Sequence, residues 1–407
     1  MKYLFLLLIS AFSLFLLGFK DKPAAVSPPN APENAALRTE KAPKPENQAD
    51  ASKSIASADI PSPRPGGERD VQVYRGTGDA SAAVTFGRDL FVMADDENNI
   101  LRAYRIGVPS PIYSYNMSDF LKTESDHPEA DIEGAAKIDR RVYWITSHGR
   151  NKDGKLRPNR YRFFATDIDI EGERIKITPV GKPCLKLLST LLSLRTMRDL
   201  DLHKAAGLGL TSLSKKDMKN LAPKEEGLNI EGLCSSADRN TLYIGFRNPR
   251  PVDQSTGRTC ALVVPLKNPA NVIEKGDTPA FGEPMLWDFA DLGIRSMEYS
   301  TFHKAYFIVA GAFDGTPDFA LYRWSGRKDE QPEFLRRMSQ SSFGPEALAP
   351  FEQSELLLML SDDGTLPVSI PDPAQCVKDE LNADGTCPNK FLLDPAKKTF
   401  RAIRLTP

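Results

Sequence analysis

Three glutamates recur at equivalent positions of a repeated sequence pattern, and they are the residues of the chain best suited to chemistry. Glu133, Glu231 and Glu346 each stand at the beginning of a short run of small residues, next to Gly or Ala. Carboxylates that converge can hold a hard cation such as Ca²⁺ through oxygen ligands, or they can act as an acid/base pair. One divergent copy carries Arg295 in place of the glutamate, where it would clamp an anion. The three glutamates are therefore candidate catalytic residues and candidate metal ligands.

Further polar residues follow the second strand of each repeat. If this strand runs antiparallel to the first, its end lies beside the start of the first strand, and these residues then share one rim of the fold with the glutamates. His148 lies in a Ser-His-Gly-Arg-Asn loop and is the most site-like of the 4 histidines, so it is also a candidate catalytic residue. No two histidines have the spacing of zinc ligands, which disfavours a histidine-based zinc site. The candidate ligand-binding residues of this rim are Arg150, Arg247, Asn248, Arg295, Asp362 and Asp363.

A purely structural role is the alternative for the repeated glutamates. Each carboxylate would then accept backbone N–H bonds from the neighbouring repeat and lock the two together. Repetition in successive copies is explained equally well by such a lock. The change to Arg295 in one copy favours a functional site, because a lock would keep the same charge.

The elements that must position these residues follow from the repeat itself. Five copies begin at Ser81, Glu133, Glu231, Arg295 and Glu346. Each copy contains a short strand of small residues, a turn, a strand of β-branched or aromatic residues, a polar loop and a third strand. This order is typical of a β-propeller blade, whose innermost strand is small because strands crowd near the axis. We therefore predict an all-β chain with a propeller of five blades.

One interval between repeats is too long for a blade. Glu133 and Glu231 are 98 residues apart, against 51 to 62 for the other intervals. Leu188, Leu191 and Leu192 recur there at helical spacing, which predicts a mainly helical insertion over residues 183–224. The alternative is a sixth blade that runs through the same segment.

The N-terminal part of the chain resembles export and tether sequences. Residues 1–20 combine a lysine with a long apolar run, which is typical of an export signal or an N-terminal membrane anchor. Residues 21–69 are rich in Pro and Ala and cannot bury enough apolar surface to fold, so we expect a disordered tether. The propeller domain then spans residues 70–407. We expect it in the periplasm or outside the cell, either free or tethered to the membrane by the N-terminal segment.

Composition narrows the choice of partner. The chain has 53 Lys and Arg against 54 Asp and Glu, and this balance disfavours a general nucleic-acid binder.

An exported chain can form disulfides. Cys376 and Cys387 flank a turn-forming stretch and are the best candidate pair among the 5 cysteines, while Cys234 and Cys260 could equally be free buried thiols.

Several of these motifs resemble, in order, a bacterial exported family called domain of unknown function three-six-one-six. The resemblance covers about residue 70 to the C-terminus and implies an exported β-propeller, without an established activity. A more distant similarity to the esterase-like phytase propellers implies phosphoester or lactone chemistry. The motifs that carry the resemblance include Asp131-Ile132-Glu133-Gly134, Ser147-His148-Gly149-Arg150-Asn151, Asn229-Ile230-Glu231-Gly232-Leu233, Gly293-Ile294-Arg295-Ser296 and Pro345-Glu346-Ala347.

Two functions of different classes follow for the polar face of the propeller. The preferred hypothesis is a binding module that takes a small molecule or an envelope protein as its partner. The alternative is a calcium-assisted hydrolase acting on a phosphorylated or sugar-derived small molecule, with the three glutamates as metal ligands or bases and with Arg247 and Arg295 as the anion clamp. A structural hub is the third hypothesis.

Overall fold

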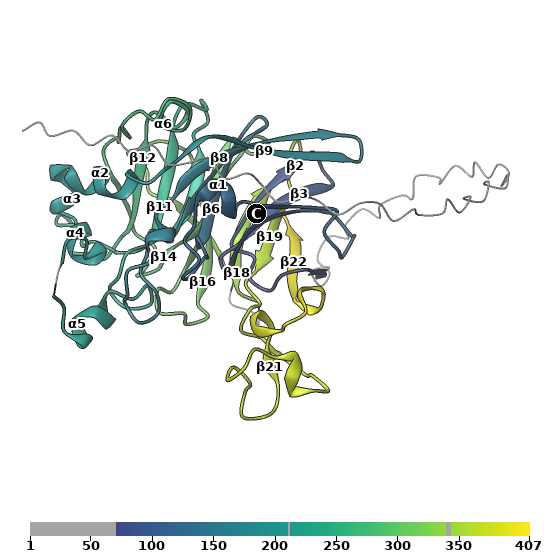
Figure 1. Ribbon diagram of the computed structural model, residues 1–407. Coiled ribbons are helices and arrows are strands. Elements are labelled where there is room, and N and C mark those ends of the chain that lie inside the picture. The colour runs from purple at the N-terminus through teal and green to yellow at the C-terminus, as the bar shows by residue number, and fades with distance from the viewer. Residues whose placement is uncertain (1–70, 211, 339–342) are drawn as a thin grey trace, which may run out of the picture. The chain divides into compact units, whose positions relative to one another are not determined.

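Five four-stranded antiparallel sheets make up the domain in the computed structural model, which describes residues 71–210, 212–338 and 343–407 (Figure 1). The first four sheets are each built from consecutive strands. They are β2 (Ala82–Phe86), β3 (Leu90–Asp95), β4 (Asn98–Arg105) and β5 (Tyr113–Asn116); β6 (Ile132–Ile138), β7 (Arg141–Thr146), β8 (Phe163–Glu171) and β9 (Arg174–Cys184); β10 (Asn229–Ser235), β11 (Leu242–Asn248), β12 (Ala261–Leu266) and β13 (Met285–Trp287); and β14 (Gly293–Ser300), β15 (Ala305–Gly311), β16 (Phe319–Trp324) and β17 (Glu333–Arg337).

The fifth sheet joins the two ends of the domain. Its order is β18 (Pro345–Pro350), β19 (Leu357–Ser361), β22 (Thr399–Leu405) and then β1 (Gln72–Arg75). Gln72 pairs with Ala402 across the last two strands. Tyr74 of β1 stacks on Phe400 of β22 with ring centroids 5.3 Å apart, so aromatic packing reinforces the closure.

The innermost strands of the five sheets form a closed ring, in which each of β2, β6, β10, β14 and β18 contacts the next and β18 contacts β2. The domain is therefore a five-bladed β-propeller, as the repeats predict, and the sixth blade is not needed. Small residues allow the inner strands to approach. A Cβ on Gly134 would lie 3.0 Å from the Cβ of Leu233 in the next blade, which explains the glycine after Glu133.

The apolar core lies between neighbouring blades, because each sheet buries both of its faces. One layer fills the space between the first two blades, around Val92 and Trp144. Another lies between the third and fourth blades, around Trp287 and Trp324. Such sheets need apolar residues on both faces of a strand, and this accounts for the continuous β-branched and aromatic runs of the repeats.

The helical insertion predicted between the second and third blades is present. It consists of α2 (Leu187–Ser193), α3 (Arg195–Arg198), α4 (Leu202–Ala206) and α5 (Lys215–Asn220). Leu188, Leu191 and Leu192 are buried in the core layer that those two blades share, so the first helices extend that layer. Shorter elements elsewhere are α1 (Ser118–Leu121), α6 (Pro269–Glu274) and the 3₁₀ turn η1 (Pro158–Arg160).

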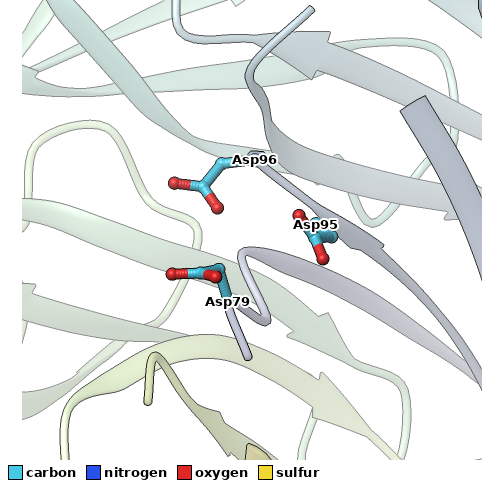
Figure 2. A group of neighbouring side chains, drawn as sticks. All are labelled: Asp79, Asp95 and Asp96. Atoms are coloured by element: carbon cyan, nitrogen blue, oxygen red, sulfur yellow. The ribbon is translucent and has the colours of Figure 1, made fainter. Parts of the chain in front are cut away.

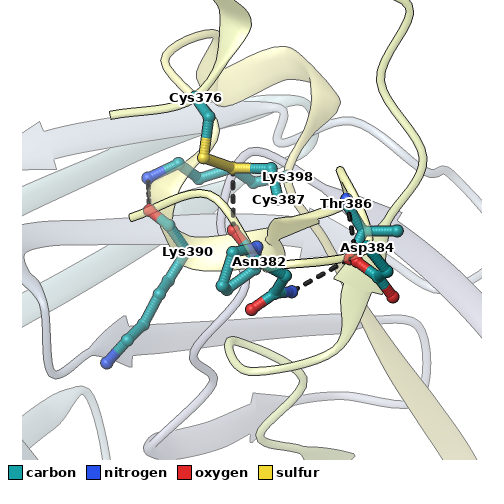
Figure 3. Close-up of a disulfide and its surroundings, with 8 residues drawn as sticks. Cys376, Asn382, Asp384, Thr386, Cys387, Lys390 and Lys398 are labelled. Carbon is teal, nitrogen blue, oxygen red and sulfur yellow. Dashed lines mark hydrogen bonds between the residues drawn. A yellow bond between two sulfur atoms is a disulfide. The ribbon is translucent and has the colours of Figure 1, made fainter. Parts of the chain in front are cut away.

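A second insertion separates β19 from β22 and was not expected. This C-terminal insertion holds β20 (Pro367–Val368), β21 (Cys387–Pro388), η2 (Pro373–Gln375), η3 (Asn389–Phe391) and η4 (Pro395–Lys397). A disulfide joins Cys376 to Cys387, which confirms the best candidate pair (Figure 3). Lys398 donates to the carbonyl of Lys390 beside it. Cys184, Cys234 and Cys260 are free thiols.

The expected export signal and the tether lie outside the described residues. The division into an N-terminal segment, a tether and a propeller domain therefore stays a prediction. Within the described ranges, no helix has the length and apolar character needed to cross a membrane.

Candidate functional site: an acidic cluster at the propeller axis

Four of the five blades carry a β-bulge at the start of the innermost strand. The ladder register shifts between Ile132 and Gly134, and the same shift recurs in the next three blades. The residue left out of the ladder is the one that the sequence repeat aligns. A bulge re-aims the side chain of the extra residue, and bulges are frequent next to functional sites. The bulged residues are Glu133, Glu231, Arg295 and Glu346.

The bulges bring the three glutamates together, as the sequence predicts. One carboxylate oxygen each from Glu133, Glu231 and Glu346 lies within 4.8 Å of the others. All three residues are buried. In the remaining blade Ser81 takes the equivalent place, and its hydroxyl donates to the carbonyl of Ile132 at 2.5 Å. Glutamates nearly 100 or more residues apart in sequence thus meet at the axis.

Four aspartates extend this group, although none of them is among the candidate site residues chosen from the sequence. Asp96, Asp131 and Glu133 form a second triad with the same spacing, and Asp79, Asp95 and Asp96 form a third (Figure 2). The triads share Glu133 and Asp96, so they are continuous. We call the seven residues the acidic cluster: Asp79, Asp95, Asp96, Asp131, Glu133, Glu231 and Glu346.

Two arginines neutralise one side of the acidic cluster. Arg295 pairs with Glu346 and, at 3.1 Å, with Glu231. Arg247 donates to the other oxygen of Glu231 at 2.8 Å. Asn229 donates to that same oxygen at 2.6 Å. Both arginines that the sequence suggests as an anion clamp are therefore buried, and both already hold carboxylates.

The aspartate side of the cluster has its own cations, placed farther out. Arg160 pairs with Asp131 at 2.9 Å. Lys390 of the C-terminal insertion pairs with Glu97, and its charge also acts on Asp79 and Asp96. Arg102 lies 3.8 Å from Asp95. These cations border the cluster, while the carboxylates occupy its centre.

Glu133 lies at the junction of two triads and has no partner. It is 8% exposed, yet no hydrogen bond or ion pair involves its carboxylate in the part of the chain that the structure describes. Asp96 is similar, because its Oδ1 is buried without a hydrogen-bond partner there. A buried charge without a partner is costly and therefore uncommon. The centre of the acidic cluster thus lacks the compensation that its rim has.

The carboxyl pKa values reflect this crowding. Burial, together with the neighbouring Asp131, Glu231 and Glu346, raises the pKa of Glu133 well above its ordinary value. Burial is also the main cause at Asp96, whose pKa is likewise raised well above normal. Burial raises the pKa of Glu346 to about 7, although Arg295 opposes the shift. The carboxylates cannot all be ionised at neutral pH unless a positive charge joins them.

The pKa of Asp79 is raised to about 9, first by burial and then by the charges of Asp362 and Asp95. Burial raises that of Asp95 to about 6. Asp362 pairs with Asp79 in a β-bridge, so this predicted rim residue does border the acidic cluster.

Other predicted residues hold loops rather than the cluster. Arg150 donates to the carbonyl of Gly207 at 2.7 Å and ties the helical insertion to the second blade. Asn248 donates to the carbonyl of Pro223 at 3.0 Å. Asp363 accepts from Arg401 of β22 at 2.6 Å. None of the three belongs to a carboxylate triad of the described residues.

His148 is buried after the end of β7 and packs edge-on against Tyr161. Its Nδ1 lies 2.8 Å from the carbonyl of Thr146. Burial lowers the pKa of the imidazole to about 4, so the ring is neutral at physiological pH. Its Nε2 is buried and unpaired within the described residues, which leaves one ring nitrogen for a ligand.

Comparisons of this chain with curated proteins and with solved structures give at most low similarities. No curated protein matches the sequence. Among solved structures, Myxococcus xanthus glutaminyl cyclase has 11% identity and a TM-score of 0.35, with 71% of this chain and 88% of that chain covered. A luciferin-regenerating enzyme has 9% identity and a TM-score of 0.34 over 83% of this chain and 95% of that chain.

A chain of a mitotic checkpoint complex has 7% identity and a TM-score of 0.34, with 87% of this chain and 100% of that chain covered. Similarities this low say nothing about function. The family match is specific and covers residues 79–343, which include the first four blades and the bulged residues Glu133, Glu231 and Arg295. The chain therefore belongs to the family described as protein of unknown function (DUF3616).

Proposed function

We propose that this propeller binds a divalent cation at the acidic cluster and uses that ion, with the neighbouring arginines, to bind a small anionic ligand. The observation that carries the proposal is Glu133, a carboxylate that is more than nine-tenths buried and has no partner in the described residues. It stands where two carboxylate triads meet. A cation there would compensate the group that the protein itself leaves uncompensated.

Calcium suits the donors better than other ions. The acidic cluster offers carboxylate oxygens only, and Ca²⁺ takes 6–8 oxygen ligands in flexible geometry. Zinc sites use His or Cys together with carboxylates, and none of the three triads contains either residue. Magnesium requires a stricter octahedron and keeps several waters. Glu133, Asp96 and Asp131 would be the central ligands, with Glu231 and Glu346 at the arginine side.

The arginines support an anionic ligand beside the ion. Arg247 and Arg295 are buried, and the Nε of each lacks a hydrogen-bond partner in the described part of the chain. If Glu231 and Glu346 turned toward a bound cation, the N–H groups of both arginines would be free to donate hydrogen bonds to a phosphate or a carboxylate. An envelope protein could supply the same acidic group in place of a small molecule.

Calcium-assisted hydrolysis is the second candidate function. The observation in its favour is Glu346, whose pKa of about 7 is suited to a general acid or base at neutral pH. A phosphorylated or sugar-derived small molecule would then be the substrate. Binding is preferred, because both arginines of the clamp are engaged by carboxylates.

Export is part of the proposal. The apolar N-terminal run supports it, and the disulfide of the C-terminal insertion is typical of an oxidising compartment. The N-terminal segment would act either as a signal or as an anchor.

Isothermal titration of the purified protein with CaCl₂ tests the proposal. We expect saturable binding that Glu133→Gln weakens by at least about tenfold, because the variant loses a central charged ligand. Glu298→Gln is the matched control, since Glu298 is an equally buried carboxyl outside all three triads. Absence of saturable calcium binding, or equal binding by Glu133→Gln, would contradict the proposal. Release of phosphate from model phosphomonoesters only when calcium is present would favour the hydrolase.

A further inference from the structure

A second site candidate lies at the other end of the innermost strands. A cavity of about 510 Å³ opens there, and we call it the strand-end cavity. The acidic cluster gathers where these strands begin, and none of its seven acids lines the cavity. Each blade contributes to the lining close to the end of its innermost strand, through Thr85, Lys137, Ser235, Tyr299 and Pro350.

One carboxyl group in this cavity is buried without a cation. Glu298 of β14 is 7% exposed, and no Lys, Arg or His lies within ion-pair distance of it in residues 71–210, 212–338 and 343–407. The backbone N–H of Tyr299 donates a hydrogen bond to the Glu298 carboxyl. Burial raises the pKa of Glu298 well above its ordinary value, although the charge of Lys137 opposes the shift. An unpaired buried carboxyl in a cavity is a typical feature of a functional site.

The other acids of the lining are already matched. Lys137 pairs with Glu352 and also donates to the backbone carbonyl of Thr85. Arg239 pairs with Asp139 at 2.6 Å. These contacts neutralise both pairs within the protein. They leave Glu298 as the lining carboxyl that a ligand cation could still satisfy.

One cation of the lining also remains. Lys304 is exposed in the turn between β14 and β15, and no acid is within ion-pair distance of it among the described residues. The cavity therefore offers an unmatched carboxyl in its wall and an unmatched ammonium at its edge. Both come from the same hairpin, six residues apart.

We propose that the strand-end cavity binds a small zwitterion, with the ligand ammonium at Glu298 and the ligand carboxylate at Lys304. The volume lies within the range of about 300–1,000 Å³ that is usual for small-molecule sites. Ser235 adds a buried hydroxyl for a polar ligand atom. The ligand class is that of free amino acids, ω-amino acids and very short peptides. This site is independent of the cation site proposed above.

Three probes with the same carbon chain test the charge requirement: 4-aminobutanoate, butylamine and butanoate. In calorimetric titrations of the full chain, we expect 4-aminobutanoate to bind tightest, butylamine at least about tenfold more weakly and butanoate not at all. Glu298→Gln should abolish binding of both amines, because the amide cannot compensate an ammonium. Lys304→Gln should reduce 4-aminobutanoate to the affinity of butylamine.

Lys328→Gln is the matched control and should bind all three probes like the wild type, because Lys328 is as exposed as Lys304 but does not line the cavity. The Lys304→Gln change lies on an exposed turn, so it tests the proposal even if Glu298→Gln fails to fold. Equal affinity for butanoate and 4-aminobutanoate would overturn the proposal. So would unchanged binding in folded Glu298→Gln, or the absence of saturable heat with every probe.

Discussion

Replacement of Glu133 by Gln should stabilise the calcium-free protein, and calcium should reduce that gain. Without the ion, Glu133 is a buried carboxyl with no partner in the described residues, and Gln keeps its shape while removing the ionisable group. The raised pKa of Glu133 means that the folded state holds a proton which the unfolded chain releases. Ion-free stability therefore falls as pH rises above the ordinary carboxyl pKa, and the variant lacks this loss.

The size of the effect is the extra cost of burying an unpaired charge rather than an unpaired neutral amide, on the order of 1–3 kcal/mol. We expect ion-free Glu133→Gln at pH 8 to be more stable than the wild type by that amount, or by about 2–6 °C in melting temperature. With calcium at 100 times the wild-type Kd, the wild type gains about 2.7 kcal/mol. A variant with tenfold weaker binding gains only about 1.4 kcal/mol. Calcium should thus reduce the advantage of the variant by about 1.3 kcal/mol, which cancels it at the lower end of the expected range.

Differential scanning calorimetry at pH 8, with EDTA and then with calcium, measures both differences. The structural account of the glutamates predicts the opposite sign. If Glu133 locks blades by accepting backbone N–H bonds, Glu133→Gln melts below the wild type in EDTA and calcium changes nothing. That result would refute the site as we describe it.

Three further predictions concern pH, the disulfide and the location of the protein. Calcium affinity should rise between about pH 6 and pH 9, because protons held by Glu346 and Asp79, with pKa values of about 7 and about 9, compete with the ion; a titration series over that range measures it. Cys376→Ser should destabilise the C-terminal insertion by about 3 kcal/mol, as expected for opening a loop of this length, and should speed hydrogen exchange there. A Cys234→Ser variant is its control, since that thiol is free. Cell fractionation should find the propeller outside the cytoplasm, and an exclusively cytoplasmic, reduced pool would contradict export.

The repeat made the blades predictable because each copy carries its own physical signature. An inner strand must be small to pack near the axis, and its glycine or alanine after the bulged residue records that constraint. Alignment of these positions was enough to place Glu133, Glu231 and Glu346 together. The helical insertion was predictable because its leucines keep helical spacing.

The other four acids of the cluster occupy positions that are acidic in only one or two copies of the repeat, so repetition alone does not select them. Asp79 reaches the cluster through a bridge to Asp362 before the first inner strand begins. Asp96 follows the bulge at the end of β3, in a turn with no equivalent acid after the second strand of the next three blades. Asp131 lies two residues before Glu133, at the position that Asp79 holds in the first copy, and the other three copies carry no acid there. The pairing of β1 with β22 could not be predicted from the sequence, because a strand of four residues is too short to show a pattern that identifies its partner.

That pairing has a consequence for how the chain acquires its fold. Gln72 and its neighbours are made before the other strands of the propeller, whereas their partners around Ala402 are made after the strands of the other four blades. The fifth blade cannot be completed until Leu405 has been made, so the ring stays open while the other four blades are synthesised. Contacts of such long sequence separation form slowly. The four blades made earlier must therefore wait for β22 before the ring can close.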